Sequence, residues 1–209
     1  MEVLLLNGSP HAHGCTARAL EEMKKEFAEN GVEVTELQVG NNPVRGCIAC
    51  GSCARSPEHH CVFSDDVTNQ VIDAAQRADG LVVGSPVYYA SPNGALAAVL
   101  DRTFYAAGRE LGFKPAASIC SARRAGTTAT LEAINKYFLM SNMLVVGSTY
   151  WAMVHGTTPE EVDQDKEGLQ TLRNLARNMT WTMDCLNAGE GIGFDKPFVE
   201  RSAKTIFVR

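Results

Sequence analysis

The chain has 209 residues, 45% of them apolar, so it can bury a substantial core without disulfides or bound metal. Its formal net charge is −5, and it contains no run of Lys and Arg that could neutralise a nucleic-acid backbone. No apolar stretch approaches the roughly 20 residues of a membrane span, and the apolar run at residues 2–6 is too short for a secretory leader. We therefore expect a cytoplasmic protein that binds neither nucleic acid nor membrane.

Short apolar segments alternate with longer amphipathic segments along most of the chain. The short segments predict strands, and the longer ones, with apolar residues at every third or fourth position, predict helices. The predicted strands span residues 3–6, 32–39, 80–83, 116–120 and 144–146. The predicted helices span residues 16–29, 66–77, 94–106, 127–140 and 159–186. This alternation predicts an α/β protein with one parallel sheet and helices on both faces.

The last predicted helix begins with a capping box, in which Thr158 precedes Pro159 and is followed three residues later by Glu161. Its apolar stripe has two interpretations, either packing on its own sheet or forming a seam between subunits. Three closely spaced glycines follow without a helical pattern. We expect one domain over residues 1–186, including a Cys-rich loop at 40–64, and an irregular tail over 187–209.

The loop after the first predicted strand, residues 7–16, is one of two unusual loops where a ligand is expected. Ligands of parallel sheets bind beyond the carboxyl ends of the strands, where the strand order reverses. Ser9 and Thr16 supply hydroxyls, His11 is a further donor, and a helix N-terminus near Cys15 would offer unpaired N–H groups to a phosphate. The loop lacks triphosphate and dinucleotide motifs, which favours a monophosphate such as that of FMN. The alternative is an ordinary turn that Thr16 caps.

The second unusual loop, residues 85–90, follows the third predicted strand. Pro86 and Val87 predict a rigid turn with backbone amides, and Tyr88 and Tyr89 add flat aromatic faces that suit an isoalloxazine ring. The alternative is that the two tyrosines pack in the core. Residues 121–126, after the fourth strand, are expected at the same edge, where two arginines either face the pyrimidine end of a flavin or are solvated.

Four of the seven cysteines fall within fifteen residues, at Cys47, Cys50, Cys53 and Cys61. In a cytoplasmic protein such a group is more typical of metal or redox chemistry than of disulfides. Four thiolates can hold a [4Fe–4S] cluster. They can also hold zinc, alone or as three thiolates with His59 or His60. The third interpretation is a loop of free or regulatory thiols.

Together, these loops resemble the NAD(P)H-dependent FMN reductase family of flavodoxin-like proteins. Residues 8–16 are similar to the family's phosphate motif, Gly-Ser-Pro-Arg-Lys-x-Gly-Asn-Thr, and residues 85–88 with Asp101 and Arg102 resemble its isoalloxazine turn and following helix. Residues 46–66 are similar to a segment of the iron–sulfur flavoprotein subgroup. The resemblance covers about residues 1–186 and implies a doubly wound, five-stranded parallel sheet of order 2-1-3-4-5.

Carried over position by position, the resemblance implies a set of FMN contacts. Phosphate contacts are expected from Ser9, His11, Cys15 and Thr16. Isoalloxazine and ribityl contacts are expected from Pro86, Val87, Tyr88 and Tyr89, and from Ser121, Ala122, Arg124 and Gly126. The chain departs from the motif where His11 and Ala12 replace a basic pair and Cys15 replaces Asn, so backbone amides must carry more of the phosphate binding.

We therefore predict an FMN-dependent oxidoreductase that moves electrons from NAD(P)H to a quinone, a flavin or another small acceptor. No acid–base residue is assigned, because the flavin carries the chemistry. One alternative is an electron carrier to protein partners, either a flavodoxin or an iron–sulfur flavoprotein. A second alternative is a non-enzymatic metal-binding or thiol-sensing module.

The resemblance also implies a homodimer or homotetramer in which a neighbouring subunit completes the flavin pocket. Tyr150 and Trp151, which follow the fifth predicted strand, are candidates for that role. Core packing is the alternative for both.

Overall fold

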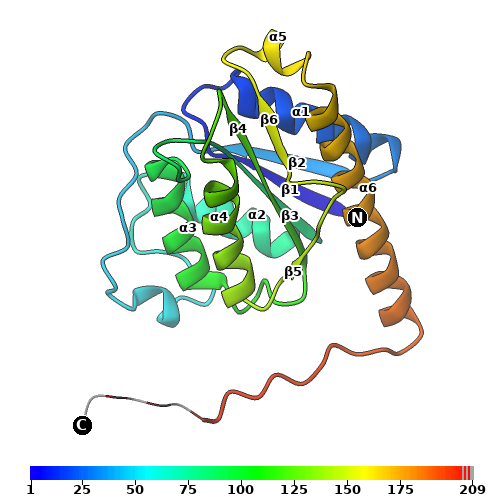
Figure 1. The fold of residues 1–209 in the computed structure, drawn as a ribbon. Helices are drawn as coiled ribbons and strands as arrows, with labels where there is room; N and C mark the ends of the chain where they lie inside the picture. Colours follow the sequence, from blue (N-terminus) through cyan, green and yellow to red (C-terminus); the bar gives the residue numbers. More distant parts are fainter. Residues whose placement is uncertain (204, 206, 208–209) are drawn as a thin grey trace.

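The structure, a computed structural model, describes residues 1–203, 205 and 207. Its centre is a parallel sheet of order β2-β1-β3-β4-β5 (Figure 1), which confirms the predicted flavodoxin-like arrangement. The first four strands are β1 (Glu2–Asn7), β2 (Glu33–Gln38), β3 (Gly80–Pro86) and β4 (Pro115–Ala122). Each lies within three residues of its predicted bounds, because a buried parallel strand has a simple apolar signature.

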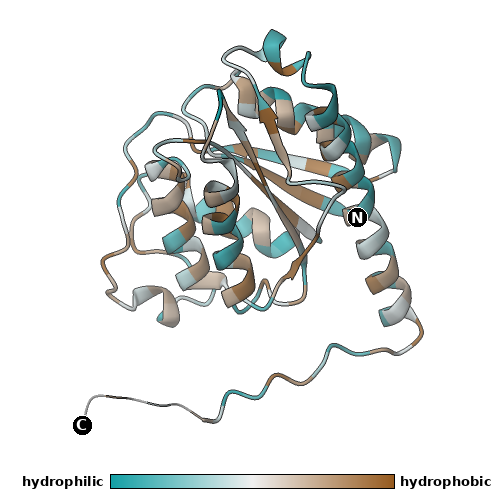
Figure 2. Ribbon diagram, in the orientation of Figure 1, coloured by the Kyte–Doolittle hydropathy of each residue, from teal (hydrophilic) through white to brown (hydrophobic). Residues whose placement is uncertain are grey.

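Helices cover both faces of the sheet (Figure 1). One face carries α1 (Cys15–Glu29) and α6 (Lys166–Gly191), and the other carries α2 (Thr68–Arg77), α3 (Gly94–Ala107) and α4 (Thr127–Met140). The core accordingly has two halves, because successive residues of a strand point to opposite faces. Leu5 packs with the α1 and α6 side and Leu4 with the α2, α3 and α4 side. Figure 2 shows apolar strands at the centre and polar outer helix faces.

The fifth position of the sheet is divided between two strands, where one was expected. Strand β5 (Leu144–Val145) pairs with the start of β4, and β6 (Met153–His155) pairs with its end. The segment between them leaves the sheet and bonds to α6 instead. Asn178 Nδ2 donates to the Gly147 carbonyl at 2.9 Å, and Ser148 Oγ donates to the Thr171 carbonyl at 2.7 Å.

The predicted helix over 159–186 is likewise two helices, α5 (Pro159–Val162) and α6. Thr158 caps α5 as expected, but Asp165 provides a second N-cap by accepting from the Gly168 N–H at 2.9 Å. Residues of the α6 stripe such as Leu172 and Met179 are buried with α1 and the sheet, which confirms packing on its own sheet. Helix α6 continues to Gly191, beyond the expected boundary at residue 186.

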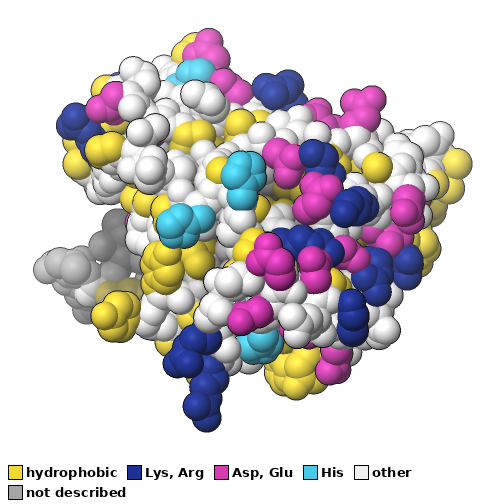
Figure 3. Space-filling model, turned by 90° about the horizontal axis from the view of Figure 1, so that it is seen from above, with side chains coloured by type: hydrophobic (Ala, Val, Ile, Leu, Met, Phe, Trp, Pro, Cys, Tyr) yellow, Lys and Arg dark blue, Asp and Glu magenta, His cyan; other side chains and the backbone are white. Residues whose placement is uncertain are grey.

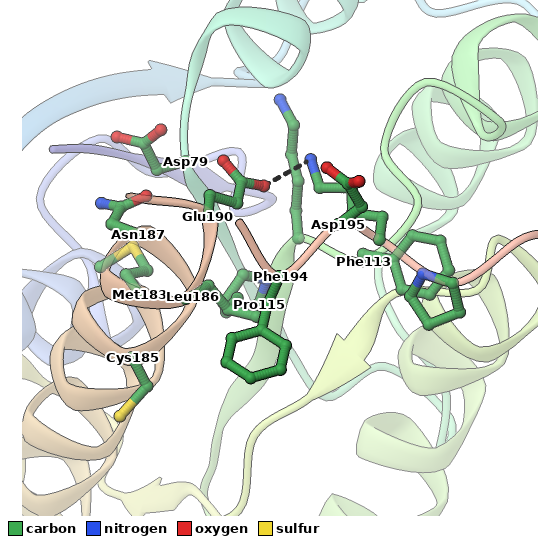
Figure 4. Close-up of a pocket in the computed structure, with 14 residues that line it drawn as sticks. Asp79, Phe113, Pro115, Met183, Cys185, Leu186, Asn187, Glu190, Phe194 and Asp195 are labelled. Carbon is green, nitrogen blue, oxygen red and sulfur yellow. Dashed lines mark ion pairs between the residues drawn. The ribbon is translucent and has the colours of Figure 1, made fainter. Parts of the chain in front are cut away.

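From residue 192 to residue 203 the tail has no regular secondary structure, and residues 204, 206, 208 and 209 lie outside the described residues. Where it leaves α6, the tail borders a cavity of about 350 Å³ (Figure 4). Asp79 before β3 and Pro115 at the start of β4 line this cavity, with Lys196 and Glu190 paired at 3.3 Å beside it. The cavity therefore lies at the amino ends of the strands, opposite to the expected ligand edge.

Acidic and basic side chains are interspersed on the surface seen from above (Figure 3). Ion pairs also join α1 to α6, such as Arg177 with the buried Glu26 at 2.7 Å. None of the helices in the described part of the chain combines the length and the apolar character needed to cross a bilayer.

Candidate functional site

The register between β1 and β3 brings the two unusual loops together. Asn7 pairs with Gly84, so both strands end at the same edge of the sheet. The Gly8 N–H donates to the Gly84 carbonyl at 2.7 Å. A Cβ at Gly8 would lie 2.4 Å from Leu96 Cδ2 and 2.8 Å from the Gly84 oxygen. This approach therefore requires glycine.

Two short hydrogen bonds shape the first loop, residues 8–16. The Ser9 N–H donates to Asn7 Oδ1 at 2.9 Å, and the His11 N–H donates to Ser9 Oγ at 3.1 Å. Ser9 is buried, whereas the side chain of His11 is exposed. The Ser9 hydroxyl keeps its own proton to donate, because Oγ acts as an acceptor in the bond from His11.

The first turn of α1 offers backbone donors. Gly14 stands at the N-cap and supplies no side-chain cap. Among the hydrogen bonds of the described residues, none uses the N–H of Cys15, Thr16 or Ala17 as its donor. These amides, with the positive end of the helix dipole, are donors of the kind that an anion can bind, which makes this turn a candidate anion site. The alternative of a turn capped by Thr16 is wrong.

The thiol of Cys15 leaves this anion site without a competing charge. Its Sγ lies 3.6 Å from the Gly156 carbonyl oxygen. Burial raises the pKa of the Cys15 thiol, and Glu161 and Glu160 act in the same direction. Cys15 is therefore a neutral thiol at pH 7, and the helix N-terminus is free to attract an external anion.

The hydroxyl of Thr16 joins the start of α1 to the end of β4. Thr16 Oγ1 and Ser121 Oγ lie 2.9 Å apart, and both side chains are buried. Ser121 in turn pairs with Pro86 across β3 and β4, and its carbonyl accepts from the Val87 N–H at 2.9 Å. Three loops thus meet at one edge of the sheet.

A tight turn follows β3. The Tyr88 N–H donates to the Ser91 carbonyl and the Ser91 N–H to the Tyr88 carbonyl, at 2.9 and 3.0 Å. The two central residues, Tyr89 and Ala90, have φ of +51° and +57°, values that side chains other than glycine, Asn and Asp seldom adopt. Tyr88 is 43% exposed and Tyr89 fully exposed, so core packing of the two tyrosines is wrong.

The loop after β4 packs directly on this turn. Gly126 has φ of +92°, and a Cβ there would lie 2.9 Å from both Ala90 Cα and Val87 Cγ1. Ala122 is buried at the end of β4, whereas Arg123 and Arg124 are exposed. The structure therefore brings the predicted FMN-binding segments together, with His11 and Arg124 exposed to solvent. The individual FMN contacts stay predictions.

Tyr150 and Trp151 form an exposed aromatic pair between β5 and β6. Their rings are edge-to-face with centroids 4.9 Å apart, and the residues are 56% and 54% exposed. Core packing, the alternative interpretation, is therefore wrong for both. The homodimer or homotetramer in which a neighbouring subunit covers them stays a prediction.

The Cys-rich loop brings its four cysteines to one small cavity of about 20 Å³. Cys47 and Cys50 are exposed, Cys61 is half-buried and Cys53 is buried. Within the described residues, no three metal-ligating side chains converge closely enough to hold an ion. Four cysteines around one cavity are nevertheless the donor set that a thiolate-bound iron–sulfur group requires.

One face of α2 holds this loop in place. Asn69 Oδ1 accepts from the Cys61 N–H at 2.8 Å, and Gln76 Nε2 donates to the Glu58 carbonyl at 3.1 Å. His60 Nε2 lies 2.6 Å from Asp73 Oδ1. Neither His59 nor His60 lines the cavity, so the structure does not support the zinc site with a histidine ligand.

Arg102 also lines this cavity, a position that the sequence did not predict. Its side chain is fully buried, and Nε donates to Cys61 Sγ at 3.2 Å while Nη1 pairs with Asp66. Burial alone would raise the pKa of Asp66, but hydrogen bonds from Arg102 and Thr68 outweigh it and lower that pKa below its usual value. Asp66 is therefore ionised at pH 7. The sequence does contain a signal for the burial of Arg102, since this arginine lies among the buried, mostly apolar residues of α3.

Known proteins of similar sequence include flavin reductases and iron–sulfur flavoproteins. The model of a family described as NADPH-dependent FMN reductase matches residues 1–158. An iron–sulfur flavoprotein of Methanocaldococcus jannaschii is 29% identical over 190 residues, which are 86% of this chain and 95% of the relative. An iron–sulfur flavoprotein of Methanosarcina thermophila is 26% identical over 183 residues, 86% of this chain and 93% of the relative.

Solved structures support the fold. The crystal structure of a WrbA-like flavodoxin from Agrobacterium tumefaciens superimposes with a TM-score of 0.61 at 16% identity, and the match covers 88% of this chain and 98% of that chain.

The bond between Thr16 and Ser121 gives a testable prediction. Thr16→Val and Ser121→Ala each leave one buried hydroxyl without its partner, so each is expected to lower the free energy of unfolding by about 1–3 kcal/mol. The double variant removes both hydroxyls and should lose less than the sum of the two. Urea denaturation of the four proteins measures this coupling. Strictly additive losses would contradict the bond.

Proposed function

Since the chain belongs to the NADPH-dependent FMN reductase family, we propose that it binds FMN at the carboxyl edge of its sheet and passes electrons from a reduced nicotinamide to a small acceptor. Membership of the family supports a flavin-dependent oxidoreductase. A quinone or a free flavin is the proposed acceptor class.

One observation carries the proposal. The unpaired amides of α1 begin beside the turn at residues 86–91, and the loop at 121–126 joins both through the Thr16–Ser121 bond and the close contact at Gly126. An anion site next to a rigid turn with exposed aromatic residues matches the two ends of FMN, a phosphate monoester and a flat ring. The loops come from three separate strands, so the arrangement does not follow from one local motif.

The protein residues have binding and orienting roles in this proposal. The amides of residues 15–17 and the Ser9 hydroxyl hold the phosphate, and the neutral Cys15 thiol adds no competing charge. The backbone of the turn at 86–91 and the loop at 121–126 hold the ring. When bound, FMN would supply a hydride acceptor and a two-electron donor between the nicotinamide and the acceptor. No side chain is then required to move a proton for the hydride step.

Reduction of bound FMN tests the proposed activity. The protein loaded with FMN under anaerobic conditions should lose its visible flavin absorbance when NADPH or NADH is added, and recover it when a quinone follows. Stopped-flow absorbance with each nucleotide measures the two rates and any preference. Retention of the absorbance with both nucleotides would instead favour an electron carrier, and a protein that binds no FMN would favour the thiol-sensing module.

Two glycine variants control for the site in this experiment. Gly8→Ala places a Cβ 2.8 Å from the Gly84 carbonyl oxygen and disrupts the close approach of the first loop to the end of β3. It should therefore weaken FMN binding and slow bleaching by at least about tenfold, a loss of roughly 1.4 kcal/mol in affinity. Gly147→Ala places a Cβ in open space, so it should change neither the affinity for FMN nor the rate of bleaching.

We also propose that the four cysteines at 47, 50, 53 and 61 hold a [4Fe–4S] cluster. Support comes from their shared cavity, from the positive charge of Arg102 beside Cys61, and from the relatives described as iron–sulfur flavoproteins. Such a cluster would accept electrons singly from the flavin, which extends the acceptors to one-electron protein partners.

Iron and sulfide analysis after anaerobic purification tests the cluster. About four iron atoms per chain are expected, the content of a [4Fe–4S] centre. Cys53→Ser should remove most of this iron, because Cys53 lies in the buried wall of the cavity. Cys185→Ser, at an exposed cysteine of α6, should retain it. Fewer than about two irons per chain in the unmodified protein would contradict the cluster.

A further inference from the structure

Arg102 is an unusual residue for the interior of this domain. Its side chain is fully buried in α3, on the wall of the cysteine cavity. A buried guanidinium is destabilising unless its charge and its N–H donors are satisfied. We therefore consider what each of its donors contacts.

The contacts of Arg102 differ from those of an ordinary structural ion pair. Arginine and a carboxylate commonly pair through two parallel hydrogen bonds. Here Asp66 receives only Nη1, which also donates to the Arg45 carbonyl at 3.3 Å. Nη2 donates to the Phe63 carbonyl at 3.0 Å, and Nε donates to Cys61 Sγ at 3.2 Å. The guanidinium is therefore oriented by Asp66 and Phe63, and its remaining edge faces a sulfur atom of the cavity.

From this geometry we propose that Arg102 is a positioning residue that sets the reduction potential of the cluster through its hydrogen bond to Cys61. This inference rests on the proposed cluster. A donor and a positive charge at a ligand sulfur favour the state with one more electron, so Arg102 raises the potential. The ionised carboxylate of Asp66 lies on the far side of the same guanidinium and acts in the opposite direction.

The buried pair allows a test in which the two partners change the potential with opposite signs. Asp66→Asn keeps an acceptor for Nη1 but removes the negative charge, so the potential should rise. Adding Arg102→Gln to that variant removes the donor and the positive charge while leaving no unpaired buried ion, so the potential should fall. A merely structural role would not give opposite signs.

The experiment uses the full chain, reconstituted anaerobically with ferrous iron and sulfide and titrated against redox mediators with EPR detection. Relative to Asp66→Asn alone, the double variant should have a reduced-to-oxidised ratio about tenfold lower at a fixed potential, which is 59 mV for a one-electron couple. Arg102→Lys should lower the potential of the unmodified protein by less than this difference, because lysine keeps the positive charge and loses the planar guanidinium donors. Arg45→Gln is the matched control, because this exposed arginine stacks on the same Phe63 ring and only its backbone carbonyl, which the substitution keeps, contacts Arg102. It should shift the potential by much less than the double variant.

Each outcome separates this inference from the proposed function. If Asp66→Asn and the double variant have equal reduction potentials and full iron content, Arg102 does not set the potential. The proposed cluster would still stand. An unmodified protein that takes up FMN but fewer than about two irons per chain would overturn the cluster and the role of Arg102 together, and leave the flavin site standing. Opposite shifts with full iron content would support the inference.

Discussion

Parallel pairing of β3 with β1 on one side and β4 on the other is the constraint on which the candidate site depends. It places Asn7 beside Gly84 and Pro86 beside Ser121, so three loops begin at one edge of the sheet. Glycine is required at two positions of this edge, because β3 and α3 leave no room for a side chain at Gly8 and the turn after β3 leaves none at Gly126. The first turn of α1 then begins at the same edge with its amides unpaired.

Helix α3 connects this edge to the cysteine cavity. At its start, the Asn93 N–H donates to Ser85 Oγ at 3.0 Å, which fixes the helix to the end of β3. At 1.5 Å per residue, about 12 Å of helix separates Gly94 from Arg102, the residue that contacts Cys61. One helix therefore connects both proposed redox sites.

The sequence was sufficient to predict features that depend on a local apolar pattern or on the order of parallel strands. The helix at residues 127–140 matches its predicted bounds, because its apolar spacing is local. The meeting of the loops after β1 and β3 was predictable from the strand order. The division of the fifth strand position was not, because it depends on bonds from α6 to Gly147 and Ser148. The pairing of Arg102 with Asp66, 36 residues apart, also has no local signal.

The central claim is that the amides at the start of α1 bind the phosphate monoester of FMN. Comparing FMN with riboflavin tests this most directly, because the two differ only in that phosphate. Titration of the flavin-free protein, followed by quenching of flavin fluorescence, gives both dissociation constants. We expect FMN to bind at least about 100-fold more tightly, a difference of about 2.8 kcal/mol. Equal affinities for the two flavins would contradict the claim.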